Sequence, residues 1–206
     1  MSAATKDLIV LVADGQMGST ITGLLSRPQR LGIREISFDI RVHPWRDAGC
    51  RGEGHTFLSS FTAQYSRALV MFDREGCGQE TMTRISLESD MEERLSVSGW
   101  DDRAACVVFD PELEIWVWSD SPHVARILGW PDREAELRAF LTQKAYFVGQ
   151  EQKPKRPKEA VEAALKNARL PRSSSRYQEL AERVSFRHCT DVGFLKFKAT
   201  LQSWFP

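Results

Sequence analysis

Acidic residues directly follow three apolar runs of the sequence, and their crowding would create a site for a cation. The runs and their acids are 8–13 with Asp14, 68–72 with Asp73 and Glu75, and 104–109 with Asp110 and Glu112. Carboxylates that lie close together repel one another unless a positive charge compensates them. A hard divalent ion such as magnesium prefers such all-oxygen ligands and keeps bound water for chemistry. Aspartate and glycine also end strands as ordinary turn residues, so a structural role stays open.

The spacing of apolar residues predicts an α/β fold that brings these acids to one edge of a sheet. Strands are predicted at 8–13, 38–42, 68–72 and 104–110, and helices at 17–25, 57–65 and 79–95. Pro28 closes the first helix, and the glycine- and arginine-rich stretch 43–55 is predicted to be a loop. Strands that alternate with helices indicate a mostly parallel central sheet with flanking helices. Ligands bind such sheets beyond the carboxyl ends of the strands.

The second part of the chain is predicted to be helical. The stretch 110–119 fits either a helix or a strand, and helices follow at Ser121-Pro122, 134–141, 161–168 and 194–201. A polar, proline-rich break lies at 151–158. We therefore expect an α/β core over 1–120 and a helical region over 121–206 that packs on it, forming one compact domain.

The composition excludes several classes of protein. The longest apolar run is too short to cross a membrane, and no signal peptide is recognisable, so we expect a cytoplasmic protein without a membrane contact. The four cysteines are scattered without a paired motif, which indicates reduced thiols. The formal net charge is zero, which argues against a general polyanion binder.

The zero net charge hides two segments of opposite sign. Eight acidic residues against two arginines lie in 75–102, and eight basic residues against two glutamates lie in 153–176. The candidate nucleic-acid contacts are Lys153, Lys155 and Arg156 of the basic segment together with Arg46 and Arg51. An ordinary solvated helix and linker is an equally good interpretation of the basic segment.

Other candidate groups fit packing better than chemistry. The histidines are His43, His55, His123 and His188, and they show no metal-ligand spacing. The glycines after Asp14 lack the lysine of a P-loop. The tryptophans at 116, 118 and 130 offer rings for stacking on bases, but core packing is the default expectation for them.

Three stretches of the sequence resemble a known family. In order, "LIVLVADGQMGSTITGLLSR", "ALVMFDREGCG" and "VVFDPELEIWVWSD" look like the Toprim-related, DUF4276-like family of small prokaryotic proteins from defence and mobile-element neighbourhoods. The signature of that group, P-E-hydrophobic-E-hydrophobic-W, matches residues 111–116, and "FLKFKATLQSWF" resembles its closing helix. Toprim domains pair an acid after the first strand with a later D-x-D motif, and together these bind magnesium for phosphodiester cleavage or transfer.

The resemblance implies a Toprim-like site and function. Asp14, Asp73 and Glu75 would bind Mg²⁺ or Mn²⁺, Glu112 would join them in catalysis, and Glu112 or Glu114 would support the ligands. The implied activity is metal-dependent nucleic-acid phosphodiester chemistry in prokaryotic anti-phage defence, with nucleic acid and other defence proteins as partners. The usual supporting motifs of an aspartyl-phosphate phosphotransferase at Asp73 are missing.

Two departures from the Toprim pattern leave an alternative open. Asp14 stands where Toprim enzymes have glutamate, and the D-x-D motif reads Asp73-x-Glu75. Carboxylates replace one another as magnesium ligands, but a reach error of about 1 Å in a catalytic base can lower a rate by about 100-fold. The alternative is a catalytically degenerate accessory subunit that keeps the Toprim scaffold and binds a protein partner.

Overall fold

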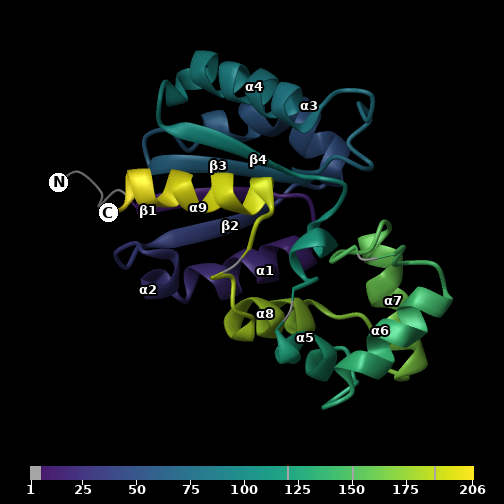
Figure 1. The fold of residues 1–206 in the computed structure, drawn as a ribbon. Coiled ribbons are helices and arrows are strands. Elements are labelled where there is room, and N and C mark those ends of the chain that lie inside the picture. Colours follow the sequence, from purple (N-terminus) through teal and green to yellow (C-terminus); the bar gives the residue numbers. More distant parts are fainter. Residues whose placement is uncertain (1–5, 120, 150, 188) are drawn as a thin grey trace.

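The computed structural model describes residues 6–119, 121–149, 151–187 and 189–206. Within these residues, four parallel strands form one sheet in the order β2-β1-β3-β4 (Figure 1). The strands are β1 (Lys6–Val12), β2 (Phe38–Val42), β3 (Tyr65–Asp73) and β4 (Ala104–Phe109). Central β1 is buried on both faces from Leu8 onward, which explains its unbroken apolar run. The predicted α/β fold with a mostly parallel sheet is confirmed, and the layout is consistent with a Toprim-like arrangement.

The helices between the strands cover both faces of the sheet. They are α1 (Gly15–Leu25), α2 (Pro28–Leu31), α3 (Arg46–Ser59) and α4 (Arg84–Leu95), followed by a π-helical turn η1 (Ser96–Trp100). Figure 1 shows α3 and α4 on one side of the sheet and α1 on the other. The chain leaves β1 toward β2 and later returns to β3 on the other side of β1. The carboxyl ends of β1 and β3 therefore form a switch point, where α/β proteins have their crevice.

Helix α3 corrects the prediction of a loop at 43–55, because the helix already begins at Arg46. Glycine lowers helix propensity by about 1 kcal/mol relative to alanine, so the glycines there suggested a loop. In the structure these glycines permit close packing: a side chain at Gly49 would meet the ring of His43, and Gly54 faces Val70 and Leu11 of the sheet. Tertiary contacts with the sheet override the weak local propensity.

Several element boundaries also differ from the prediction. Tyr65 begins β3 instead of ending a helix, α4 begins at Arg84 and not near residue 79, and Pro28 opens α2. The ambiguous stretch 110–119 is neither a regular helix nor a strand. It contains a short 3-10 turn, η2 (Leu113–Trp116), whose backbone bonds join residues three apart.

The C-terminal region is helical, as predicted. Its helices are α5 (Pro122–Ile127), α6 (Glu134–Gln143), α7 (Pro157–Asn167), α8 (Ser174–Arg183) and α9 (Val192–Trp204). Helix α8 was not predicted, and it packs on α1 where Gly23 leaves room: a Cβ there would lie 2.7 Å from the carbonyl oxygen of Gln178. Helix α9 returns to the sheet and packs on β4.

Carboxylates of α4 cover the open edge of β4. The backbone N–H groups of Cys106 and Val108 donate to Glu92 (2.9 Å) and Glu88 (3.0 Å) where a fifth strand would otherwise pair. Lys196 of α9 bridges these two glutamates, at 2.7 Å from Glu92 and 3.2 Å from Glu88. The hydrogen bonds to the glutamates satisfy two backbone donors of the edge strand, so these donors are not free to pair with a strand of another chain.

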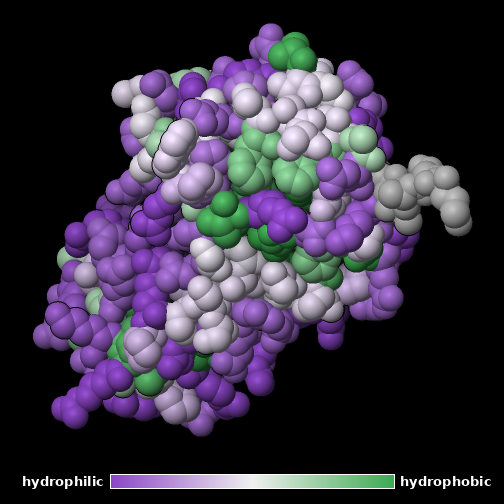
Figure 2. Space-filling view, turned by 180° about the vertical axis from the view of Figure 1, so that it is seen from behind, coloured by the Kyte–Doolittle hydropathy of each residue, from purple (hydrophilic) through white to green (hydrophobic). Residues whose placement is uncertain are grey.

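One face of the molecule is mostly polar. Figure 2 shows one face on which hydrophilic side chains predominate around a small apolar patch near the centre. No helix in the described part of the chain is long and apolar enough to cross a membrane.

Candidate metal centre

Three buried carboxyl groups meet where β3 and β4 end. One oxygen from each of Asp73, Glu112 and Glu114 lies within 4.8 Å of the others. Asp73 is the last residue of β3, whereas the two glutamates flank Leu113 where the chain enters η2. The backbone N–H of Leu113 donates to Asp73 Oδ1 at 2.8 Å. This hydrogen bond holds the turn against the end of β3 and so brings the glutamates to Asp73.

A small polar cavity of about 150 Å³ lies at the same edge of the sheet. It is lined by Asp14, Met17, Arg46, Asp47, Asp73, Leu113, Glu114, Lys158 and Arg172. Both the α/β core and the C-terminal helical region therefore contribute to its wall. With Glu112 of the carboxylate cluster, the site gathers five acidic and three basic side chains.

Two of the acids are held at the beginnings of helices. Asp14 is the N-cap of α1, and its Oδ1 accepts from the backbone N–H groups of Gln16 and Met17, each at 2.9 Å. Asp47 lies in the first turn of α3, and its Oδ1 accepts the backbone N–H of Asp73 at 2.8 Å. The positive ends of both helix dipoles thus face the cavity and favour negative charge there.

The basic side chains pair with some of these acids and not with others. Lys158 donates to Glu112 at 3.2 Å, Arg172 donates to Glu114 at 2.6 Å, and Arg46 approaches Asp14 at 3.5 Å. Neither Asp47 nor Asp73 has an ion-pair partner among the residues that the structure describes. The carboxylate of Asp73 therefore has a hydrogen bond from Leu113 but no direct contact with a cation among the described residues.

The electrostatics of the cavity follow from burial and crowding. Burial, and then the charges of Asp47 and Glu114, raise the pKa of Asp73 well above its usual range. Burial also raises the pKa of Asp47, with a smaller contribution from Asp14, and it raises the pKa of Glu112 despite the opposing charge of Lys158. For Lys158, burial alone would lower the pKa, but the surrounding glutamates and Asp73 outweigh it and raise the value. The site is short of positive charge.

The burial of Asp73 among other carboxylates predicts how a substitution there changes the stability of the metal-free protein. Asp73→Asn removes the charge but keeps an oxygen for the Leu113 N–H. A carboxyl with a raised folded-state pKa destabilises the fold only above its unfolded pKa of about 4, and increasingly so until the pH passes the folded value. We therefore expect the variant to melt at a higher temperature than the wild type near neutral pH, by about 2–4 °C for each kcal/mol relieved, with no difference in acid.

Melting curves in EDTA between pH 4 and pH 8 measure this difference. Asp102→Asn, at an exposed aspartate outside the cavity, serves as the control. The difference between its melting temperature and that of the wild type should not grow with pH. A lower melting temperature of Asp73→Asn throughout the range would mean that Asp73 is a structural turn residue.

The structure brings only some of the predicted site residues together. Asp14, Asp73 and Arg46 line the cavity, and Glu112 belongs to the adjoining carboxylate cluster. Glu75 does not line the cavity. Its side chain is exposed in the turn after β3, where it contributes only a weak repulsion toward Glu112.

Most of the predicted nucleic-acid contacts lie elsewhere. Arg51 is held against Asp90 of α4 at 3.4 Å, and Lys153 donates to the Ile115 carbonyl at 2.9 Å. Lys155 and Arg156 form exposed pairs with neighbouring glutamates. Of this predicted group, only Arg46 reaches the acidic cavity.

Sequence reasoning missed Asp47, Lys158 and Arg172 as site residues. Asp47 lies in the stretch wrongly predicted to be a loop, five residues after β2 ends, so it did not share the direct strand-to-acid step that marks Asp14 and Asp73. Lys158 and Arg172 lie in the basic segment, but no spacing in the sequence relates them to the strands.

Among the described residues, the histidines and tryptophans considered as candidates do not line the polar cavity. His43 is buried, and its Nδ1 accepts the backbone N–H of Trp45 at 3.2 Å. His188 lies outside the described residues. Trp118 and Trp130 are buried in the core, as expected, whereas Trp45 is 64% exposed beside Arg46.

Comparison of the chain with protein-family models, with curated proteins and with solved structures found no match in any of the three.

Proposed function

We propose that this cavity binds Mg²⁺ or Mn²⁺ and that the protein uses the ion in phosphodiester chemistry on nucleic acid. The observation that carries the proposal is the environment of Asp73. Its enclosed carboxyl group lies within 4.8 Å of Glu112 and Glu114 and has no ion-pair partner among the described residues. Only a proton or a bound cation can relieve such a charge.

The donor atoms suit a hard divalent ion. Asp73, Glu112 and Glu114 offer only carboxylate oxygens, and Asp14 and Asp47 add further oxygens in the cavity wall. Magnesium and manganese prefer oxygen ligands, whereas zinc more often binds histidine or cysteine. When bound, such an ion supplies Lewis acidity and lowers the pKa of an attacking water.

Side chains of the cavity are suited to hold the phosphate of a substrate. Arg46 is the most open of the three cations, with a side chain 72% exposed and only a 3.5 Å approach to Asp14. It can turn toward a phosphate at little electrostatic cost, because exposed pairs of this kind contribute about 0–1 kcal/mol. The exposed ring of Trp45 beside it offers a surface on which an unpaired base can stack.

Asp14 is suited to a supporting role. Its Oδ1 is fully engaged in capping α1, and Oδ2 alone faces the cavity mouth at Arg46. The proposed setting is that of the resemblance: a cytoplasmic protein of prokaryotic anti-phage defence, with nucleic acid and other defence proteins as partners.

A second candidate function is that of a non-catalytic subunit, and one observation favours it. Arg172 and Lys158 already neutralise Glu114 and Glu112, two of the three clustered carboxylates. Both cations come from the C-terminal region, so these ion pairs fasten that region to the core. Such a site would need no metal, and the scaffold would serve to bind a protein partner.

The deciding experiment offers single-stranded DNA, duplex DNA and RNA to the pure protein with Mg²⁺, Mn²⁺ or EDTA. We expect cleavage of at least one substrate with metal and none in EDTA. A parallel thermal melt should show stabilisation by Mn²⁺, because a ligand that binds only the folded state raises its stability. Metal stabilisation without cleavage keeps the metal site but contradicts the cleavage activity. The absence of both contradicts the metal site and supports the non-catalytic subunit, whose ion pairs need no metal.

A further inference from the structure

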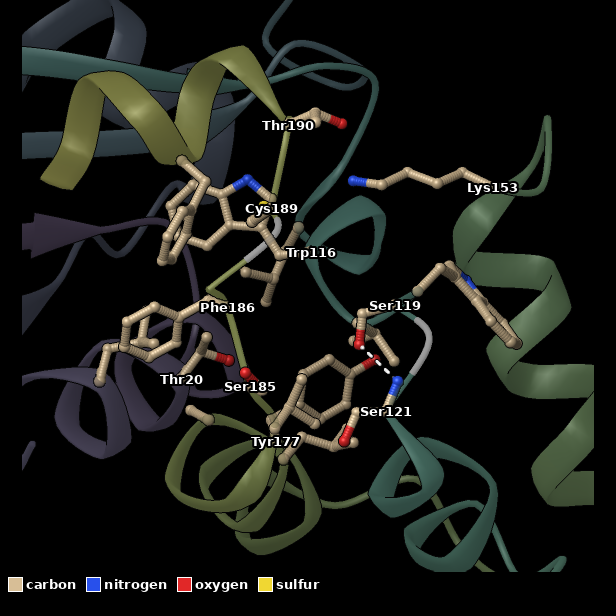
Figure 3. Close-up of a pocket in the computed structure, with 18 of the residues that line it drawn as sticks. Thr20, Trp116, Ser119, Ser121, Lys153, Tyr177, Ser185, Phe186, Cys189 and Thr190 are labelled. Carbon is tan, nitrogen blue, oxygen red and sulfur yellow. Dashed lines mark hydrogen bonds between the residues drawn. The ribbon is translucent and has the colours of Figure 1, made fainter. Parts of the chain in front are cut away.

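A second, larger cavity lies between the core and the C-terminal helices. Its volume is about 350 Å³, within the usual range of small-molecule pockets. Figure 3 shows it bordered by α1, α8, the chain after η2 and the segment that leads into α9. The wall is mainly apolar, with aromatic contributions from Trp116, Trp118, Tyr177, Phe186 and Phe194.

The polar atoms of the aromatic wall are already satisfied within the protein. The indole N–H of Trp116 donates to Asp191 Oδ1 at 2.8 Å, and that of Trp118 donates to the Pro157 carbonyl at 3.0 Å. The hydroxyl of Tyr177 donates to Glu114. These residues therefore offer ring carbons to the cavity, and an occupant need not supply hydrogen-bond acceptors for them.

A positively charged side chain reaches the cavity from one of the described lining residues. Lys153 is the one charged side chain among the described residues that line the cavity. Figure 3 shows its ammonium group reaching toward Trp116 and Thr190. It donates to the Ile115 carbonyl at 2.9 Å and forms an ion pair with Asp191 Oδ2 at 3.7 Å, a separation too long for a good hydrogen bond. An ammonium group has three hydrogens to donate, so Lys153 retains capacity for an anionic acceptor.

Water is a poor occupant for most of this space. A volume of this size equals about a dozen waters, and each buried water needs two to four polar partners. The aromatic part of the wall provides none, and an empty space would forfeit the dispersion contacts of its lining. An apolar body with one anionic end fits both the rings and the ammonium group.

We propose that this cavity binds a small aromatic monoanion of about a dozen non-hydrogen atoms, with its ring among the aromatic side chains and its carboxylate on Lys153. The proposal is independent of the metal centre, although Leu113 lines both cavities.

The test uses three compounds with the same phenylbutyl body and nearly equal size: 4-phenylbutyrate, its neutral amide 4-phenylbutanamide, and the cation 4-phenylbutylamine. Isothermal titration calorimetry of the full chain should show saturable, one-to-one binding of the carboxylate at millimolar concentration or below. The amide should bind about tenfold more weakly and the amine more weakly still, because the ammonium group favours the negative charge.

Two kinds of variant locate the binding. Lys153→Met should lower the affinity for the carboxylate to that for the amide and leave the amide unchanged, whereas Lys155→Met, at an exposed lysine outside the cavity, should change neither. Leu180→Trp and, independently, Val184→Phe fill the cavity and should abolish binding of all three compounds, with melting curves to verify folding. Equal affinities for the three compounds, an unchanged affinity in Lys153→Met, or no saturable binding would each overturn the proposal.

Discussion

Asp73→Asn is expected to lower metal-dependent cleavage of nucleic acid by at least about 100-fold. The substitution removes the charge that lacks a cation partner and leaves the hydrogen bond to Leu113 N–H in place. Stabilisation by a bound ion supplies several kcal/mol in the transition state, and each 1.36 kcal/mol is a factor of ten in rate. Initial rates at saturating Mn²⁺ on the substrate that the wild type cleaves measure the loss.

Glu75→Gln is the matched control for this experiment. Glu75 follows two residues after Asp73 but is exposed and does not line the cavity, so the variant should retain cleavage within a few-fold. A loss in Glu75→Gln as large as in Asp73→Asn would restore the Asp-x-Glu pair as the metal ligands. Cleavage that persists undiminished in Asp73→Asn would point to contamination and contradict the site.

Asp14→Glu tests the departure from the Toprim pattern in the same assay. Glutamate is the residue that Toprim enzymes, which the sequence resembles, have at this place, and it adds one methylene of reach, so we expect the cleavage rate to be preserved or raised. Because Asp14 also caps α1, the melting temperature of the Asp14→Glu variant must be measured together with its cleavage rate. A rate that falls while folding is intact would show that the shorter side chain is the functional one here.

Arg172→Met is expected to destabilise the protein by about 3–5 kcal/mol, the usual effect of breaking a buried ion pair from one side. Glu114 is 1% exposed, and Arg172 is its only cationic contact among the described residues. Without the guanidinium group, the carboxylate remains buried and uncompensated beside Asp73. For a chain of this length the loss corresponds to a fall in Tm of roughly 6–20 °C, measurable by circular dichroism.

A second substitution separates lost charge from lost packing. Glu114→Gln in the Arg172→Met background removes the uncompensated carboxylate and should restore a large part of the stability. Arg183→Met breaks an exposed pair with Glu179, in which the side chains are 57% and 45% exposed, and should change Tm little. If Arg172→Met behaves like Arg183→Met, the ion pairs do not fasten the C-terminal region to the core.

The apolar patterns of the sequence determined the sheet and the edge at which its acids lie. Leu8 to Val12 is buried throughout, and an unbroken apolar run of this length is a central parallel strand. Strand direction then determines which ends meet, so Asp14 and Asp73 could be assigned to one edge before the structure was known. Helix α3 could not be predicted, because its glycines are favoured by contacts with His43 and the sheet and not by local propensity.

Only the tertiary structure decided which acids meet Asp73. Side chains two residues apart, such as those of Asp73 and Glu75, point to the same face of a sheet only within a strand. Strand β3 ends at Asp73, before a turn in which Gly76 has a φ of 88°. The hydrogen bond from Leu113 instead brings Glu112 and Glu114 to the site. Lys158 and Arg172 reach it because the C-terminal helices fold back onto the core, a contact between distant segments that no local spacing encodes.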